Sequence, residues 1–367
     1  MKQILAFLII LFCHNVSKAQ DYYLKNNGPY ENNIQSPEEY LGYEIGFEHT
    51  RHDLIVNYLK YLSNISEKAK IVKYGESHQG RDLIMLTISS TQNLKNLDKI
   101  KEEHLKHTIP GVKTKIDSEL PIIINLGYGV HGNEPSSAEA AILAAYTLVA
   151  SENNKIKRLI QNSVIFIDPT INPDGRDRHS QWANQYKSIN LVADSNDAEH
   201  NEAWPRGRTN HYWFDLNRDW LLGINPESRG KLKWYHEWYP NVVTDFHEMG
   251  TNSNYFFEPM KRNASVKPMI PDENYSVLSP IFAEYYVKAL DSIGSFYYTK
   301  ESFDETYPGY GSSYPDVQGA VAILFEQASS RGHLQETNYG TMSFGFTIRN
   351  QYLSSIATVE AAVDNKD

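Results

Sequence analysis

Four stretches of the chain are apolar at nearly every position, which is typical of strands buried on both faces of a sheet. They are LPIIINLGYG (120–129), SVIFIDPTINPDG (163–175), NVVTDFHEMG (241–250) and AVAILFEQ (320–327). Apolar residues at helical spacing predict helices between and around them, at residues 46–63, 135–152, 223–239, 276–294 and 345–363. Strands that alternate with helices in this way predict an α/β fold with a mostly parallel sheet flanked by helices.

The segment AKIVKYGESHQGRDLIMLTISS, which begins at Ala69, adds two strands joined by a turn from Gly75 to Gly80. We find no internal repeat, low-complexity tract or Pro/Gly/Ser-rich linker that would divide the chain. We therefore expect one catalytic domain over residues 41–367, after a loose polar lead-in over residues 20–40.

The N-terminus has the pattern of a signal peptide. Lys2 precedes the apolar stretch from Ile4 to Cys13, and small residues occupy Ser17 and Ala19. About ten apolar residues are too few for the roughly 20 that span a bilayer, so we expect no stable membrane anchor. The bulky Phe12 before Cys13 argues against a lipoprotein cleavage site. The sequence predicts cleavage after Ala19 and a secreted or periplasmic protein.

Charge and cysteine content narrow the possible partners and environment. The 367 residues carry a formal net charge of −10 without long runs of one sign, which argues against binding to nucleic acid or anionic lipid. The only cysteine lies at position 13, so we expect a mature chain without disulfides that depends on its core or on bound metal for stability.

Potential metal ligands cluster at the ends of the expected strands. His131 and Glu134 follow the first apolar stretch, His247 closes VVTDFH, and Glu326 closes AVAILFE. The carboxyl ends of strands in an open α/β sheet line one crevice, so these groups should converge. Two imidazoles and a carboxylate form a catalytic zinc site that leaves one position for water. His-x-x-Glu alone would more simply be a solvated loop; its combination with the distant His247 and Glu326 favours the metal site.

Six motifs in order resemble those of zinc metallocarboxypeptidases of the carboxypeptidase A/B class, in their secreted bacterial branch. They are YGESHQGRDLIMLTIS, HGNE, INPDG, FDLNRDW, DFHEMG and ILFEQ. The resemblance implies a single domain with a sheet of about eight strands. It also implies one zinc ion per chain held by His131, Glu134 and His247, with Glu326 as the general base that takes a proton from the attacking water.

The same resemblance assigns the substrate contacts. Arg218 would grip the terminal carboxylate of the substrate with two parallel hydrogen bonds, and Asn217 would donate a third. Either arginine of WPRGR could stabilise the tetrahedral oxyanion. We favour Arg208 over Arg206 because it lies nearer the Asn-Arg pair in the sequence.

The resemblance also implies a mobile tyrosine that closes over the substrate, in the segment YPGYGSSYPD. Tyr307 best fits the distance to the GSS that follows, and Tyr310 is the alternative. The residue that selects the substrate's terminal side chain should lie nearby, at Tyr314 or Asp316.

We therefore expect a monomeric zinc metallopeptidase that removes the C-terminal residue of peptides. A cell-wall enzyme that trims muropeptides is the main alternative, because such substrates also present a free carboxylate. Two further alternatives are a zinc amidohydrolase acting on acylated amino acids and a binding protein without catalytic activity. The presence of Glu326 argues against the last of these, since a binding protein does not need a base.

Overall fold

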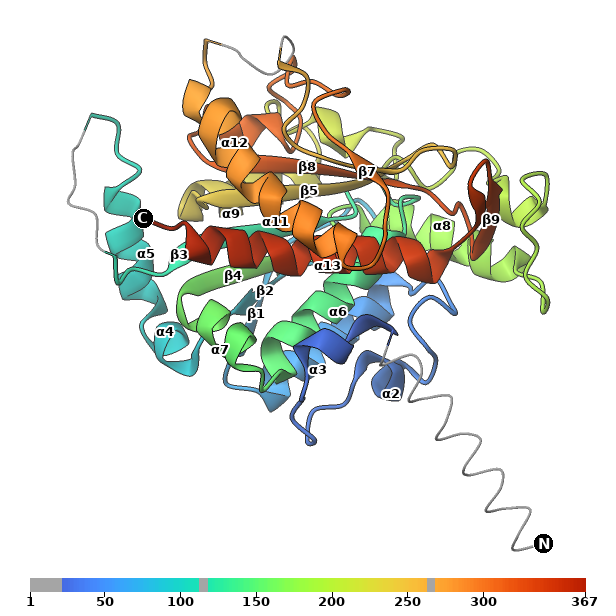
Figure 1. The fold of residues 1–367 in the computed structure, drawn as a ribbon, viewed down its shortest axis with the longest axis horizontal. Coiled ribbons are helices and arrows are strands. Elements are labelled where there is room, and N and C mark those ends of the chain that lie inside the picture. Colours follow the sequence, from blue (N-terminus) through green and yellow to red (C-terminus); the bar gives the residue numbers. More distant parts are fainter. Residues whose placement is uncertain (1–21, 112–117, 263–267) are drawn as a thin grey trace, which may run out of the picture.

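The computed structural model describes residues 22–111, 118–262 and 268–367, which fold around a mixed eight-stranded sheet (Figure 1). The strand order is β1-β2-β4-β3-β5-β8-β6-β7. The four central strands β4, β3, β5 and β8 are parallel, whereas β2 pairs with β4, and β6 with β8, in antiparallel fashion. The bounds are β1 Ala69–Glu76, β2 Asp82–Ile88, β3 Ile122–Tyr128, β4 Ser163–Asp168, β5 Val242–Met249, β6 Tyr255–Phe257, β7 Tyr297–Tyr298 and β8 Val321–Ala328.

Helices cover both faces of this sheet. Successive strand residues point to opposite faces, so Ile124 packs into one apolar cluster and Ile123 into another. The first cluster takes in α2 Pro37–Leu41, α3 His52–Ile65, α6 Ser136–Ala150, α7 Asn154–Gln161, α11 Ser279–Asp291 and α13 Phe344–Asp364. The second takes in α5 Leu97–Lys106, α9 Pro226–Trp238 and α12 Ser313–Val317.

The remaining elements lie around this framework. They are α4 Thr91–Lys95, α8 Pro173–Tyr186, η1 Lys25–Asn27, η2 Ala198–His200, η3 Leu216–Arg218, η4 Asn274–Leu278 and the hairpin of β9 Leu334–Thr337 with β10 Gly340–Ser343. Several of their loops form the rim of the site described below.

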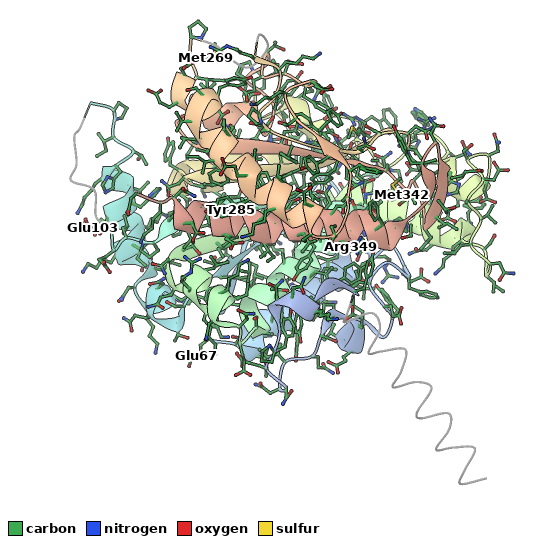
Figure 2. The ribbon with its side chains drawn as sticks, viewed as in Figure 1. Glu67, Glu103, Met269, Tyr285, Met342 and Arg349 are labelled. Carbon is green, nitrogen blue, oxygen red and sulfur yellow. The ribbon has the colours of Figure 1, made fainter. Side chains whose placement is uncertain are left out.

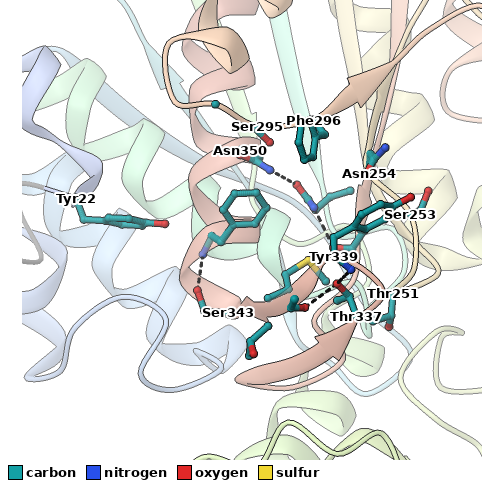
Figure 3. Close-up of a pocket in the computed structure, with 17 residues that line it drawn as sticks. Tyr22, Thr251, Ser253, Asn254, Ser295, Phe296, Thr337, Tyr339, Ser343 and Asn350 are labelled. Carbon is teal, nitrogen blue, oxygen red and sulfur yellow. Dashed lines mark hydrogen bonds between the residues drawn. The ribbon is translucent and has the colours of Figure 1, made fainter.

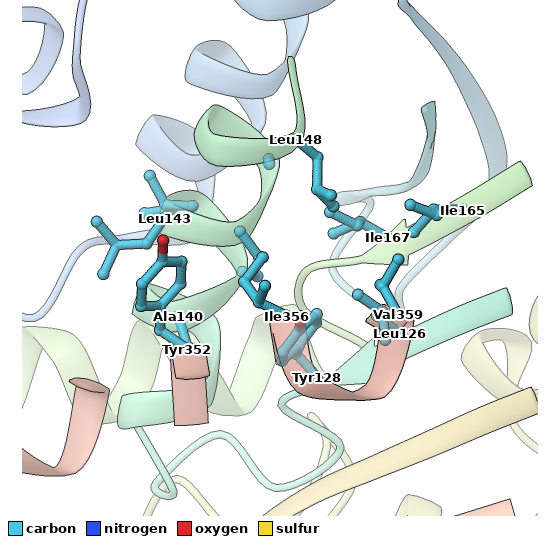
Figure 4. Packing of buried hydrophobic residues seen from close by; sticks show 14 of the residues in the cluster. Leu126, Tyr128, Ala140, Leu143, Leu148, Ile165, Ile167, Tyr352, Ile356 and Val359 are labelled. Carbon is cyan, nitrogen blue, oxygen red and sulfur yellow. The ribbon is translucent and has the colours of Figure 1, made fainter. Parts of the chain in front are cut away.

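The main core lies between the sheet, α6 and α13 (Figure 4). Every residue of α6 is buried, and its many alanines let α13 approach closely. Polar groups in this core are paired: the Tyr128 hydroxyl donates to Ser355 Oγ at 2.8 Å, and Tyr352 Oη lies 2.8 Å from Thr147 Oγ1. On the outer side of α13, the Tyr285 hydroxyl of α11 donates to Asp364 at 3.1 Å (Figure 2).

The architecture confirms the predicted fold class, including the sheet of eight strands. Two local expectations differ from the structure. The lead-in expected to be loose packs Tyr23, Leu24 and Ile34 into the main core, because these apolar side chains find partners on the helical layer. The stretch 163–175, expected to be a strand, forms β4 only as far as Asp168. Its end contains the start of α8, where Pro173 takes the first helical position and the Asn172 side chain accepts a hydrogen bond from Gly175 N.

The signal-peptide prediction lies outside the described residues. Within the described ranges, no helix combines the length and the apolar character needed to cross a membrane.

Candidate active site

Three strands bring the expected ligands to one edge of the sheet. His131 lies in the loop after β3, and Glu134 lies just before α6. His247 is in β5, where it pairs in register with Glu326 of the neighbouring strand β8. The parallel pairing of β3, β5 and β8 therefore places all four residues together, as expected for the carboxyl ends of such strands.

The polar ends of three side chains meet at one point. His131 Nδ1 lies 2.8 Å from Glu134 Oε1, His247 Nδ1 lies 2.9 Å from Glu134 Oε2, and the two Nδ1 atoms are 3.1 Å apart. Ligands placed about 2.0–2.2 Å from a tetrahedral zinc ion stand roughly 3.3 Å from one another, so this spacing fits one ion. The donor set of two imidazoles and one carboxylate also matches zinc.

The far side of each imidazole is held by a carboxylate. His131 Nε2 lies 2.8 Å from Asp215 Oδ1, and His247 Nε2 lies 2.9 Å from Asp245 Oδ1. Such contacts place the proton on Nε2, leave Nδ1 as the metal-binding atom and fix the plane of the ring. Sequence reasoning missed this role for both residues, because Asp215 is 84 positions away from His131 and Asp245 sits inside an apolar strand.

Glu134 is fixed by the backbone around it. Its Oε2 accepts a hydrogen bond from Glu248 N at 3.0 Å. Burial alone would raise the pKa of Glu134, but the positive charges that His131 and His247 can carry outweigh burial and hold it well below its usual range. Glu134 is therefore a carboxylate, the form that binds a cation.

A cavity of about 280 Å³ opens in front of the ligands. Its wall includes His131, Glu134 and His247 together with Glu326. Burial, the largest cause, raises the pKa of Glu326 to about 8, partly offset by the nearby His247. A carboxyl group with a raised pKa beside the reacting centre is suited to taking and returning a proton near neutral pH.

Both arginines of the expected substrate contacts reach this cavity. The Arg218 side chain is half exposed and stacks over the Tyr310 ring at 4.6 Å. Arg208 contacts Glu134 Oε1 at 3.1 Å and Asp215 Oδ2 at 3.0 Å. Arg206, the alternative, lines a different cavity and does not reach the ligands.

Asn217 lines the cavity, but its amide is engaged with the protein. Its Nδ2 donates to Asp245 at 3.0 Å and lies 2.9 Å from His247 Nε2, and its Oδ1 accepts from Gly311 N at 2.6 Å. One N–H and the oxygen of this amide are therefore engaged within the protein, and the expected contact of its second N–H with a substrate carboxylate stays a prediction. Asn217 also holds Asp245, the carboxylate that positions His247.

The two candidate lid tyrosines occupy different places. The Tyr307 hydroxyl donates to Arg218 O at 2.9 Å, outside the cavity wall, whereas Tyr310 is part of that wall. Tyr314 and Asp316 also lie away from it: Tyr314 Oη is 2.8 Å from His236 Nε2, and Asp316 is buried. Residues that the sequence did not single out complete the wall, among them Met249, Phe303, Ser312 and Leu324.

A larger cavity of about 390 Å³ lies elsewhere, lined by residues such as Tyr22, Thr251, Phe296, Tyr339 and Asn350 (Figure 3). None of the described residues that line it is Asp, Glu, His, Lys or Arg. It lacks groups for acid–base or metal chemistry, so the smaller cavity is the candidate active site.

Comparison with known proteins agrees with this geometry. The family model described as zinc carboxypeptidase matches residues 55–348. The catalytic chain of human carboxypeptidase N is 23% identical over 263 residues, covering 65% of this chain and 52% of that protein. Mouse carboxypeptidase Z is 28% identical over 284 residues, covering 67% of this chain and 38% of that protein. The chain thus spans about half the length, or less, of these relatives.

Solved structures share the fold. A metallo-carboxypeptidase from Burkholderia cenocepacia matches with a TM-score of 0.58 at 15% identity, covering 86% of this chain and 70% of that one. Carboxypeptidase A from Helicoverpa armigera matches with a TM-score of 0.56 at 15% identity, covering 96% and 82%. At these identities the structural matches establish the architecture alone.

Proposed function

The chain belongs to the zinc carboxypeptidase family, and from that premise we propose that it is a zinc-dependent carboxypeptidase that hydrolyses the C-terminal peptide bond of peptides. One observation carries the proposal: the two histidine Nδ1 atoms are 3.1 Å apart, each lies within 2.9 Å of an oxygen of Glu134, and the same cavity contains Glu326 and Arg218. This combination provides a metal site, a base and an anchor for a carboxylate in one place.

Each side chain then has a definite task. His131, Glu134 and His247 would hold the zinc ion, which supplies Lewis acidity to the scissile carbonyl and to the attacking water. Glu326 takes the proton of the attacking water and returns it to the leaving amine.

The cationic side chains position the substrate. The guanidinium of Arg218 grips the terminal carboxylate, which fixes the scissile bond one residue from the metal. Arg208, beside Glu134, stabilises the negative charge that develops on the carbonyl oxygen. Tyr310, stacked with Arg218, covers the bound terminal residue.

The test is release of single amino acids from matched peptides that differ only at the C-terminus. With zinc bound, the protein should trim a peptide with a free carboxylate and leave its C-terminally amidated twin intact. Arg218→Ala should raise KM for the free acid by at least tenfold. Equal cleavage of acid and amide would contradict an exopeptidase. Cleavage of only a muropeptide or of N-acylated amino acids in the same panel would move the assignment to those substrates.

We also propose that residues 1–19 direct export and are removed after Ala19. The apolar stretch from Ile4 to Cys13 followed by small residues supports this. N-terminal sequencing of the protein recovered from the periplasm or medium should begin at Gln20. Recovery only from the cytoplasm with residues 1–19 intact would contradict it.

A further inference from the structure

A second group of metal-binding side chains lies outside the candidate active site. His49, Glu199 and His333 each offer one ligand atom, and these atoms all lie within 4.8 Å of one another. All three residues are at least 98% buried. They come from the loop before α3, from η2 and from the residue before β9, so distant parts of the chain converge on this point.

The imidazoles of this group lack ordinary hydrogen-bond partners. Among the described residues, none pairs with either ring nitrogen of His49 or with Nε2 of His333. Leaving a buried polar group unpaired destabilises the folded state, because the group loses its hydrogen bonds to water and gains none in the protein. A metal ion bound to one ring nitrogen of each histidine would remove part of that cost.

The surroundings are arranged to hold these rings and the carboxylate. His49 stacks on Phe344 with centroids 4.0 Å apart, and its ring lies edge-on to that of His333 at 4.6 Å. Glu199 Oε1 accepts a hydrogen bond from His333 N at 2.6 Å and lies 2.6 Å from His333 Nδ1. A Cβ added to Gly332 would lie 2.3 Å from Glu199 Oε1, so only glycine there leaves room for the carboxylate.

His49 is in the form that binds metal. Burial, together with the nearby His333 and His179, holds the pKa of His49 well below its usual range, so its ring is neutral at pH 7. A neutral imidazole has a free lone pair, whereas an imidazolium has none. Two imidazoles and a carboxylate are a zinc donor set, the same set as in the active site.

We propose that His49, Glu199 and His333 bind a second zinc ion, which is structural. The ion joins three segments, the loop before α3, η2 and the β9–β10 hairpin, of which the last two already share a hydrogen bond from His333 N to Glu199 and a contact of His200 Nε2 with Leu334 O. In Figure 1, β9 and α8 are both drawn at the same end of the molecule.

The site also borders the loop that carries Arg208. A third imidazole, from His179 of α8, lies 5.1 Å from that of His49, and its Nδ1 is 2.9 Å from Glu202 Oε1. Glu202 in turn accepts hydrogen bonds from Asn133 Nδ2 at 2.8 Å and Gly207 N at 3.0 Å. These contacts connect the surroundings of the proposed second site to the loop between η2 and Arg208.

Zinc stoichiometry of the full chain tests the proposal, because the two sites can be removed separately. After equilibration with excess zinc and exhaustive dialysis, the wild-type protein should retain two zinc ions per chain. His131→Ala should retain one, His49→Phe should retain one, and the double variant none. Phenylalanine preserves the stack on Phe344 but cannot bind metal. His236→Gln, which changes an exposed histidine of α9, should retain two.

Activity and stability separate this proposal from the peptidase proposal. His49→Phe should keep peptide cleavage at 25 °C within about twofold of wild type. The zinc-dependent rise in Tm that remains in His131→Ala reports on the second site, and His49→Phe should lose most of that contribution. If His49→Phe does not fold, anomalous scattering at the zinc edge from wild-type crystals decides instead. One zinc per wild-type chain, or an anomalous peak only between His131 and His247, would overturn the second site and leave the first intact.

Discussion

Among the described residues, no hydrogen bond or ion pair with the Glu326 side chain explains its position beside the metal ligands. It pairs in register with His247 and faces the cavity, and its pKa is raised to about 8 chiefly by burial. We predict that Glu326→Gln retains zinc and lowers kcat by about 10²–10⁴-fold, because the amide cannot accept the proton of the attacking water. Single-turnover kinetics beside metal analysis measures both. Unchanged kcat with zinc retained would remove this residue from the mechanism.

The two arginines of WPRGR provide a matched pair of variants. Arg208 lies beside Glu134, whereas Arg206 is exposed and lines another cavity. We predict that Arg208→Ala lowers kcat by about 10²–10³-fold, as removal of an oxyanion donor typically does, and that Arg206→Ala has little effect. Steady-state kinetics on one peptide compares them directly. A larger loss in Arg206→Ala would reverse the assignment.

Asp215 is predicted to act through the metal ligand it holds. Its Oδ1 lies 2.8 Å from His131 Nε2, so Asp215→Asn should weaken control of the imidazole tautomer without removing a ligand. We expect zinc affinity to fall by about 10–100-fold, measured by competition with a chromophoric chelator. Asp53→Asn, in an exposed ion pair with Arg51, is the control and should leave affinity unchanged. An affinity within twofold of wild type in Asp215→Asn would show that the contact is incidental.

The metal ligands could be predicted at the residue scale because each follows a recognisable apolar strand. The carboxylates that support these ligands could not be predicted, because only contacts in the folded protein identify them. Asp215 contacts His131, 84 positions away, and Asp245 contacts His247, two positions away. The amide of Asn217 was expected to meet the substrate, and packing also gives it two hydrogen-bond partners inside the protein, Asp245 and Gly311 N. The second histidine group was invisible for the same reason: His49 and His333 are far apart in the chain and belong to no short motif.

At the scale of elements, three glycines join the ligand loop, the start of α8 and the loop before Arg208. A Cβ added to Gly132 would lie 2.0 Å from Gly175 C, and one added to Gly175 would lie 2.4 Å from Gly207 O. Backbone therefore packs directly on backbone, and only glycine permits it at these positions. This contact sets how closely HGNE approaches the helix that begins in INPDG.

We predict that Gly132→Ala destabilises the protein by about 1–3 kcal/mol and weakens zinc binding, because the ligand loop must move to accommodate the methyl group. Urea unfolding with and without zinc separates the two effects. Gly250→Ala, at the end of β5, is the matched control because an added Cβ there meets no atom within 4 Å. Equal stability of the two variants would mean that the loop can shift without cost.

Long elements followed the hydrophobic pattern, and short ones did not. The strands β3, β5 and β8 and the helices α6 and α13 have enough buried side chains for the pattern to define them. By contrast, β6 and β7 contain three and two residues; β6 pairs with the edge of β8, and β7 pairs with β6. The stretch 163–175 was expected to be one strand, but β4 ends at Asp168 and the cap at Asn172 starts a helix.

At the scale of the whole molecule, buried carboxyl groups tie stability to pH. Glu258, Glu305 and Asp316 lie together behind the cavity wall, where Glu258 Oε1 accepts a hydrogen bond from Leu324 N at 2.9 Å. Burial raises the pKa of Asp316 to about 7. Burial, followed by the charges of Glu305 and Asp316, also holds the pKa of Glu258 well above its usual range.

Because the folded pKa of Asp316 exceeds its unfolded value of 3.8, the folded state binds more protons between about pH 4 and 7. The free energy of unfolding should therefore fall as pH rises through this window, by a few kcal/mol. We predict that Asp316→Asn flattens the fall and is more stable than wild type at pH 8, since an amide never has to ionise.

The control for this prediction is Glu102→Gln, which removes an exposed carboxylate of α5 and should follow the wild-type curve. Urea unfolding of the three proteins from pH 5 to 8, without added metal, gives the comparison. The substitution should preserve the local hydrogen bonds, because the side-chain oxygen of an asparagine at position 316 can still accept from Ala322 N and Asn274 Nδ2. A variant less stable than wild type at pH 8 would therefore contradict the prediction and mean that the ionised carboxylate stabilises the fold.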